Sequence, residues 1–353
     1  PPEPLSLTLR TLHAELREQA VALAAEGGLV DPPGSIVRKR IGRGSFLYYQ
    51  FRDLGGGTRQ LYLGPEDDES TTELADTIAQ GGDASGRADL RALHAAYVAA
   101  GAPVLEHAPM RVLRAFADAG VLRPQQGAAV LVGTFAFAAY AHLLGVRWTG
   151  ALATQDIDVA ASAIELVTKR PQQSAPEALE QLGMGFLPVP SLDPRAPSTS
   201  FKVRGQAMRV DLLAPATGRE PEGHVFVPAF GSMAATLPLL DYLIEDGVAG
   251  LAVGRRDLLL IALPVPERFA LHKLLVARLR PSVFATKAAK DRQQAIQVLT
   301  VLRDEAPLGI EAAMRALQSR GSRWNRALHE ALDALAREAP ELAEWLDAEG
   351  AGT

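Results

Sequence analysis

The stretch from residue 128 to residue 145 constrains the fold most. Residues 128–132 form a short apolar run that predicts a buried strand, and Gly133 and Thr134 follow it as a turn. Residues 135–144 then have helical character, with Gly145 as the predicted C-cap. A glycine lets the backbone approach a ligand closely, and the first turn of a helix offers free N–H groups. We therefore expect a phosphate-binding turn here, to which the threonine hydroxyl adds a hydrogen bond.

The next predicted strand carries Asp156 and Asp158. Side chains two residues apart on a strand point to the same face, so the two carboxylates must lie together. Like charges raise one another's pKa, and a divalent cation relieves this repulsion. Because hard oxygen ligands suit such ions, the pair predicts a site for Mg²⁺ or Mn²⁺. A solvated strand end is the alternative interpretation.

A third acid, Asp211, lies on the return strand of a predicted hairpin over residues 201–213. It is a candidate third metal ligand and the candidate general base for an incoming hydroxyl. Alternatively, it pairs with Arg209 on the same strand or with Lys202 across the hairpin.

The whole chain predicts an α+β protein with a mixed β-sheet core. Residues 1–126 form a mixed N-terminal domain with a β-hairpin over 46–64, residues 127–265 form the core, and residues 266–353 form a helical domain. Helices are expected at about 267–280, 286–303, 309–319 and 323–347.

Composition excludes several classes of function. The 353 residues include no cysteine, which rules out disulfides, thiolate metal sites and a cysteine nucleophile. The net charge of −5 disfavours wholesale coating of nucleic acid but leaves room for a local basic patch. No apolar run is long enough to span a bilayer, and the start lacks the pattern of a signal peptide. We expect a cytoplasmic protein with no membrane partner.

These motifs resemble the DNA polymerase β-type nucleotidyltransferase superfamily, whose signature is a Gly-Ser turn, an Asp-x-Asp strand and a third Asp on a later strand. The matching residues are Gly133 and Thr134, Asp156 and Asp158, and Asp211. The longer stretch is similar to bacterial stand-alone nucleotidyltransferase-like proteins, including AbiEii and MenT type toxins. The resemblance implies that the three acids are catalytic and hold the metal ions, while the Gly-Thr turn binds the nucleotide.

The same resemblance implies a lysine on a helix after the sheet that touches the nucleotide phosphates, a role that Lys273 could fill. It also implies a nucleoside triphosphate such as ATP as substrate, a tRNA or protein acceptor, and an antitoxin protein as a partner. Lys273 lies on the apolar stripe of its helix, so either a phosphate contact or a salt bridge would explain it. Its neighbour His272 is expected to be a core histidine, and Lys287 and Asp291 are expected to pair on a helix surface.

Two basic clusters leave their roles open. The 46–64 hairpin carries aromatic and arginine side chains that either stack bases and contact phosphates or protect a sheet edge; these are Tyr48, Tyr49, Phe51, Arg52, Arg59 and Tyr62. A second cluster is either an RNA-docking surface or the solvated face of a helical cap; it comprises Arg315, Arg320, Arg323 and Arg326.

From the sequence we expect a metal-dependent enzyme that transfers a nucleoside monophosphate to an acceptor hydroxyl and releases pyrophosphate. The alternatives are a catalytically silent nucleic-acid-binding or regulatory module with the same scaffold, and a nucleotidyltransferase that modifies a small molecule.

Overall fold

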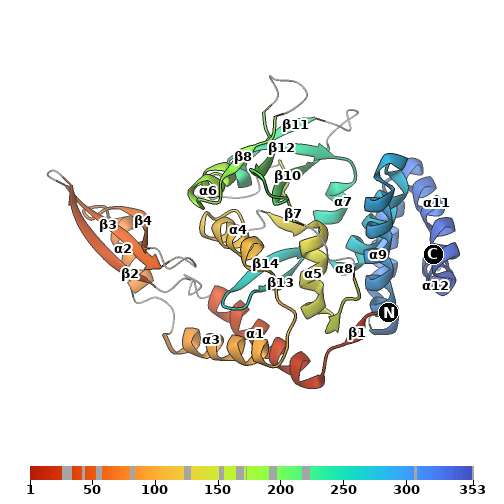
Figure 1. Cartoon of the computed structure of the whole chain (residues 1–353), viewed down its shortest axis with the longest axis horizontal. Helices are drawn as coiled ribbons and strands as arrows, with labels where there is room; N and C mark the ends of the chain where they lie inside the picture. The colour runs from red at the N-terminus through yellow and green to blue at the C-terminus, as the bar shows by residue number, and fades with distance from the viewer. Residues whose placement is uncertain are drawn as a thin grey trace. The chain divides into compact units, whose positions relative to one another are not determined.

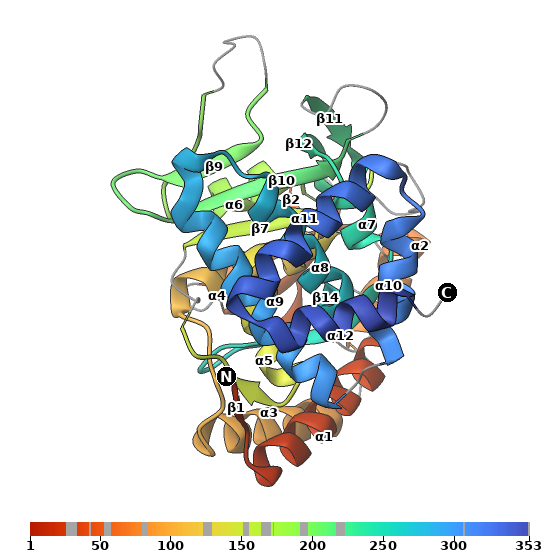
Figure 2. The ribbon, with the colours of Figure 1, turned by 90° about the vertical axis from the view of Figure 1, so that its right-hand side faces the viewer.

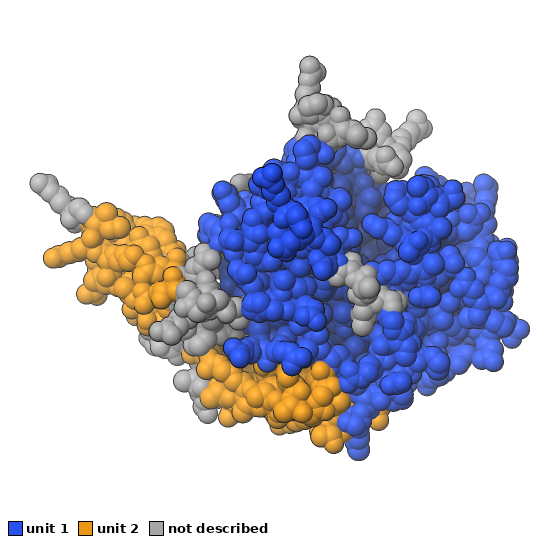
Figure 3. Space-filling model, in the orientation of Figure 1, with its two compact units in different colours: residues 1–7, 103–353 blue, residues 8–102 orange. Residues whose placement is uncertain are grey.

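The computed structural model describes residues 1–25, 34–41, 44–52, 58–79, 84–122, 129–150, 155–163, 171, 173–190, 197–216, 223–305 and 308–351. The chain forms two compact units, shown as a ribbon in Figure 1 and as surfaces of different colour in Figure 3. Unit 1 comprises residues 1–7 and 103–353, and unit 2 comprises residues 8–102. The predicted division at 126/127 lies outside the described residues, and the three-domain organisation remains a prediction.

A mixed sheet forms the centre of unit 1 (Figure 1). Its described strands run in the order β11-β12-β10-β7-β5, and β9 pairs with β10 and with β8 at one side. β10 is parallel to β7 and β12, whereas β5 is antiparallel to β7 and β9 is antiparallel to β10. The strands are β5 (Val130–Val132), β7 (Asp156–Ala160), β8 (Phe186–Pro188), β9 (Ser200–Val203), β10 (Arg209–Pro215), β11 (His224–Val227) and β12 (Ser232–Leu237).

Alternation along β7 and β10 decides which side chains enter the core. Ile157 and Val159 of β7 are buried, as are Val210 and Leu212 of β10. Because strand side chains alternate between the two faces of a sheet, the residues between them point the other way. This pattern leaves one face of the paired strands for polar side chains.

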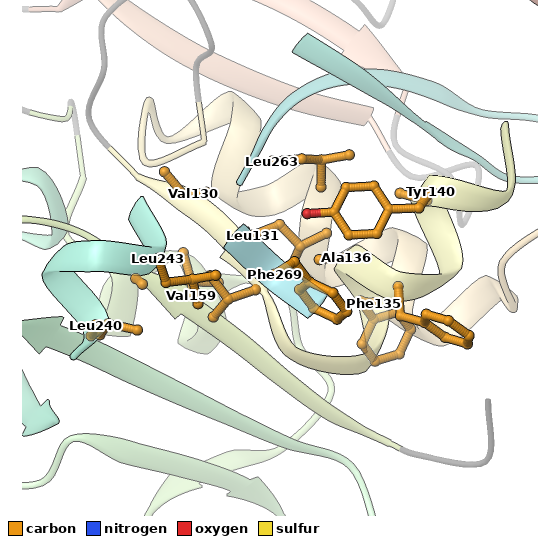
Figure 4. Close-up of a cluster of buried hydrophobic side chains, with 14 of the residues drawn as sticks. Val130, Leu131, Phe135, Ala136, Tyr140, Val159, Leu240, Leu243, Leu263 and Phe269 are labelled. Carbon is orange, nitrogen blue, oxygen red and sulfur yellow. The ribbon is translucent and has the colours of Figure 1, made fainter. Parts of the chain in front are cut away.

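Helices cover the apolar face and build one continuous core (Figure 4). Helix α5 (Gly133–Leu143) packs on β5 and β7, and α8 (Pro266–Leu279) brings Phe269 against Tyr140 with ring centroids 5.0 Å apart. The Tyr140 hydroxyl donates to the carbonyl oxygen of Pro264 at 2.7 Å, which satisfies the polar end of this buried side chain. The remaining elements that frame this core are α4 (His107–Asp118), α6 (Ala175–Gln181), α7 (Leu240–Ile244), β13 (Gly247–Val253) and β14 (Leu258–Pro264), while β1 (Glu3–Pro4) pairs with β6 (Val146–Arg147).

The C-terminal part is helical as expected, with one correction (Figure 2). The helix predicted over 323–347 is two helices that meet at Ala339 and Pro340. Proline lacks an N–H and clashes with the preceding turn, so Pro340 begins a new helix instead of continuing the old one. The described helices after α8 are α9 (Ala285–Glu305), α10 (Leu308–Gln318), α11 (Ser322–Glu338) and α12 (Pro340–Ala351).

Unit 2 combines helices with a small antiparallel sheet in the order β2-β3-β4. The predicted hairpin is confirmed as β3 (Gly44–Arg52) and β4 (Thr58–Pro65), whereas β2 (Gly34–Ile41) was not predicted from the sequence. Helix α2 (Glu69–Ala79) packs against all three strands. The other helices are α1 (Leu7–Ala25) and α3 (Ala84–Ala99). The predicted α+β class is therefore confirmed.

Candidate active site

The three predicted acids lie on one face of two adjacent strands. β7 and β10 pair in parallel with Asp158 opposite Asp211 and Asp156 opposite Arg209. All four residues lie on the face away from the core, because each alternates with a buried neighbour. Neighbouring strands lie about 4.8 Å apart, so residues in register on one face are side-chain neighbours.

Gly133, the first residue of α5, allows the helix start to lie next to Asp158. Its φ of +66° belongs to the left-handed region, and a Cβ at this position would overlap Oδ2 of Asp158. Val132, the preceding residue, is the register partner of Asp158 across the β5–β7 pair. Only glycine satisfies both the backbone conformation and this close approach.

The first turn of α5 also presents Thr134, which is buried and accepts a hydrogen bond from Nε2 of Gln294 at 3.2 Å. Among the described residues, no side chain caps the start of this helix. The side chain of the N-cap residue therefore satisfies none of the first N–H groups of α5, and this helix start adjoins Asp158.

Burial and mutual repulsion perturb Asp158. Desolvation is the main cause that raises its pKa to about 7, and the charges of Asp211 and Asp156 add to this shift. Lys273 and Lys287 partly offset it. A carboxylate in this position is costly to ionise, and a nearby cation would lower that cost.

Asp211 is held by two neighbours. Nε of Arg209 donates to its Oδ1 at 2.8 Å, the hydroxyl of Ser200 donates to the same oxygen, and the Arg209 guanidinium also donates to that hydroxyl at 2.8 Å. The pairing with Arg209 considered from the sequence is thus present. Lys202, the other considered partner, lies in register with Arg209 instead.

Lysine and arginine side chains from the helices form the opposite wall. Nζ of Lys273 lies 2.6 Å from Oδ1 of Asp291, and Nε of Arg280 lies 2.7 Å from its Oδ2. Burial alone would raise the pKa of Asp291, but these two cations hold it below the usual value. Both interpretations of Lys273 therefore stay open, because it forms a salt bridge and also faces the pocket.

Asp291 does not form the helix-surface pair expected from the sequence. It is buried between Lys273 and Arg280, whereas Nζ of Lys287 lies 4.0 Å from Oδ2 of Asp156. The sequence does contain a signal for this arrangement. Asp291 lies three or four residues from the buried Ala288 and Ala295, and Val298 continues the same face of α9. An acid within such an apolar stripe requires a partner of opposite charge.

One pocket of about 420 Å³ collects these groups. Three of its acids come from the sheet and Asp291 from α9, whereas its basic groups come from α8, the following residue Arg280, α9 and β10. This arrangement suits a polyanion bound next to a cation. Four of the basic residues were not predicted from the sequence to bind a ligand, namely Arg209, Arg280, Lys287 and Lys290. The described lining includes Thr134, Asp156, Asp158, Asp211 and Asp291, together with Arg209, Lys273, Arg280, Lys287 and Lys290.

Other candidate groups lie outside this pocket. His272 is not among the described lining residues, and desolvation followed by the charge of Lys273 lowers its pKa to about 3, so it is neutral at physiological pH. In the arginine cluster of the C-terminal helices, Arg315 pairs with Glu311, and Arg320 pairs with Asp241 and Glu245. These pairs favour the helical-cap interpretation for two of its four arginines.

Two absences apply to the described residues. Within them, no three His, Asp or Glu side chains are already gathered closely enough to hold a metal ion. Within the same residues, no helix has the length and apolar character needed to cross a membrane.

Comparison with known proteins identifies the family to which the chain belongs. A family model described as "Nucleotidyltransferase" matches residues 107–319, which contain β5, β7, β10 and the helices that line the pocket. The chain belongs to this nucleotidyltransferase family.

Two further comparisons add less. No curated protein matched the chain. A crystal structure of an antigenic nucleotidyltransferase-like protein from Paracoccidioides brasiliensis is similar over 70% of this chain and 95% of its own, with 14% identity and a TM-score of 0.37.

Proposed function

We propose that this protein transfers a nucleoside monophosphate from a nucleoside triphosphate to an acceptor hydroxyl. The observation that carries the proposal is that Asp156, Asp158 and Asp211 line one pocket, on one face of two paired strands, beside the helix start at Gly133. Membership of the nucleotidyltransferase family supports it. An acidic cluster alone has many explanations, but one that adjoins free helix N–H groups and a wall of cations suits a triphosphate.

The donor set fits Mg²⁺ or Mn²⁺, because carboxylate oxygens are the ligands that these ions prefer. Asp158 supports this fit, since it is a desolvated carboxylate beside two others. Bound metal would supply positive charge that neutralises the triphosphate and the departing pyrophosphate. Oδ1 of Asp211 is engaged by Arg209 and Ser200, so coordination by Asp211 would use its other oxygen or displace the arginine.

The chain's own residues would act as follows. Gly133 and Thr134 would bind phosphate oxygens through backbone N–H groups and the hydroxyl, and Lys273 would contribute positive charge. Asp211 would take the proton of the acceptor hydroxyl as that oxygen bonds to the α-phosphorus. The bond between the α-phosphorus and the bridging oxygen would break, and pyrophosphate would leave.

The acceptor and the biological setting follow only from the resemblance to AbiEii and MenT type proteins. On that basis we propose ATP or another triphosphate as donor, a tRNA end or a protein side chain as acceptor, and an antitoxin as regulatory partner. A cytoplasmic location is part of the same proposal. The alternative of a silent nucleic-acid-binding module makes the opposite prediction in the experiment below.

Replacing Asp156 with alanine is expected to reduce labelled-nucleotide incorporation by at least about 100-fold. This residue is the best first target, because its side chain is 37% exposed. Its ion-pair partner Lys287 is 63% exposed and would stay solvated in the variant. The measurement is transfer of label from α-³²P nucleoside triphosphates into tRNA or protein with Mg²⁺ present.

The matched control is Asp304→Ala, which removes an exposed aspartate at the end of α9 and should leave incorporation unchanged. Full incorporation by Asp156→Ala, or by the wild type in excess chelator, would contradict the proposed mechanism. Oligonucleotide binding without any incorporation would favour the silent module.

A further inference from the structure

The small sheet of unit 2 has two unlike faces. Leu47 and Tyr49 of β3 are buried, and Gly64, the register partner of Leu47, lies so close to Thr71 of α2 that a Cβ there would overlap it. One face is therefore covered by α2. Because side chains alternate along a strand, Tyr48 lies on the other face. We call this other face the open face; its described side chains include Lys39, Phe46, Tyr48, Gln50, Gln60 and Tyr62.

Aromatic rings cluster on the open face. The ring centroid of Tyr62 lies 5.3 Å from that of Tyr48 and 6.1 Å from that of Phe46. Tyr62 is 51% exposed, so it presents a ring to solvent instead of filling a core. Nζ of Lys39 lies 4.9 Å from the Tyr48 centroid, which places a cation beside the rings.

The strands of this sheet are basic, unlike the chain as a whole. The three strand sequences contain five basic residues and no acidic one, although the whole chain has a net charge of −5. Helix α2, on the covered face, carries Glu69, Glu73 and Asp76. Arg38 pairs with Glu66 beyond the end of β4, so at least one of the five cations is partly neutralised. The five are Arg38, Lys39, Arg40, Arg52 and Arg59; the side chains of the last two lie outside the described residues. Because side chains alternate along β2, Lys39 lies on the open face, and Arg38 and Arg40 lie on the side of Leu47.

We propose that the open face binds single-stranded nucleic acid. Exposed aromatic rings provide stacking platforms for bases, and a basic surface follows the phosphate backbone. Tyr48 and Tyr62 would stack bases, and Lys39 would contact phosphates. The amides of Gln50 and Gln60 hydrogen-bond to each other at 2.5 Å, and their remaining donors and acceptors would bond to base edges. A single strand fits better than a duplex because only unpaired bases expose their faces to a ring. This site goes beyond the proposed transfer reaction and requires no catalysis.

The test is fluorescence anisotropy with the full-length protein, in chelator and without nucleoside triphosphate. The probes are a fluorescein-labelled twelve-nucleotide RNA of mixed sequence, the DNA of the same sequence, and the corresponding duplex. We expect both single strands to bind and Tyr62→Ala to weaken binding by about 5- to 100-fold, while Tyr62→Phe retains it. Lys39→Gln should lower the slope of log affinity against log salt by about 0.7.

The matched control is Phe226→Ala, which removes an aromatic ring of the same 51% exposure from β11 in unit 1 and should leave binding unchanged. Lys287→Ala tests the basic wall of the pocket as the other candidate binding surface. Equal binding by Tyr62→Ala and the wild type would overturn the proposal. So would absence of wild-type binding, preference for the duplex, loss of binding only in Lys287→Ala, or a change of oligomeric mass as the sole effect of Tyr62→Ala. Because the assay contains no triphosphate, its failure would leave the incorporation result unaffected.

Discussion

Asp158→Asn is expected to abolish nucleotide transfer and to stabilise the protein at alkaline pH. The carboxylate is desolvated beside Asp211, and its pKa is raised to about 7. Since the folded state binds this proton more tightly than the unfolded chain does, the contribution of Asp158 to stability falls as pH rises from about 4 to about 7. An asparagine of the same shape carries no charge and avoids that loss.

At pH 8 without divalent metal, the variant should therefore unfold with a free energy roughly 2 to 4 kcal/mol higher than the wild type, and near pH 4 the two should be similar. Urea unfolding at the two pH values measures this difference. Adding Mg²⁺ should stabilise the wild type and not the variant. A ligand stabilises a protein by binding its folded state, and the variant lacks one of the proposed metal-binding carboxylates. Asp304→Asn serves as the exposed control. If the variant has a lower free energy of unfolding than the wild type at pH 8, the ionised Asp158 carboxylate stabilises the fold, and the prediction is wrong.

Gly133→Ala is expected to destabilise the protein by about 2 to 4 kcal/mol and to impair transfer. Two effects combine, namely the positive φ of +66° and the overlap of the new Cβ with Oδ2 of Asp158. The carboxylate would have to move away from the helix start, so both the phosphate-binding turn and the acidic pair would be displaced. Thermal or urea unfolding gives the stability, and incorporation of labelled nucleotide gives the activity.

The chain offers a control that separates the two effects. Gly183 has a φ of +67° and nothing within 4 Å of an added Cβ, so Gly183→Ala should cost only the conformational strain of about 1 to 2 kcal/mol. In an Asp158→Ala background, Gly133→Ala should lose its larger penalty and behave like the control. An unchanged penalty in that background would mean that the close approach to Asp158 has no energetic consequence.

Local patterns predicted the parts of the site that depend on neighbouring residues in the chain. The strand, glycine turn and helix at β5–α5 follow from short-range preferences, and alternation alone places Asp156 and Asp158 on one face. The structure brings Asp211 beside them through strand pairing, while the metal and catalytic roles of all three stay predictions.

Contacts between residues far apart in the sequence could not be predicted from local patterns. Asp291 has Lys287 four residues before it, which favours a local pair, yet tertiary packing places it between Lys273 and Arg280. Strand β2 was missed because it follows a region rich in glycine and proline and its pattern is interrupted by three consecutive basic residues. The break at Pro340 was available from the sequence and was overridden by an apolar periodicity that continues on both sides.

Anomalous diffraction from crystals soaked with Mn²⁺ and a non-hydrolysable nucleoside triphosphate would test the proposed metal and phosphate sites together. We expect Mn²⁺ bound by carboxylate oxygens of Asp156, Asp158 and Asp211, with phosphate oxygens at the start of α5. A triphosphate bound elsewhere, or Mn²⁺ that leaves these three side chains uncoordinated, would contradict this expectation.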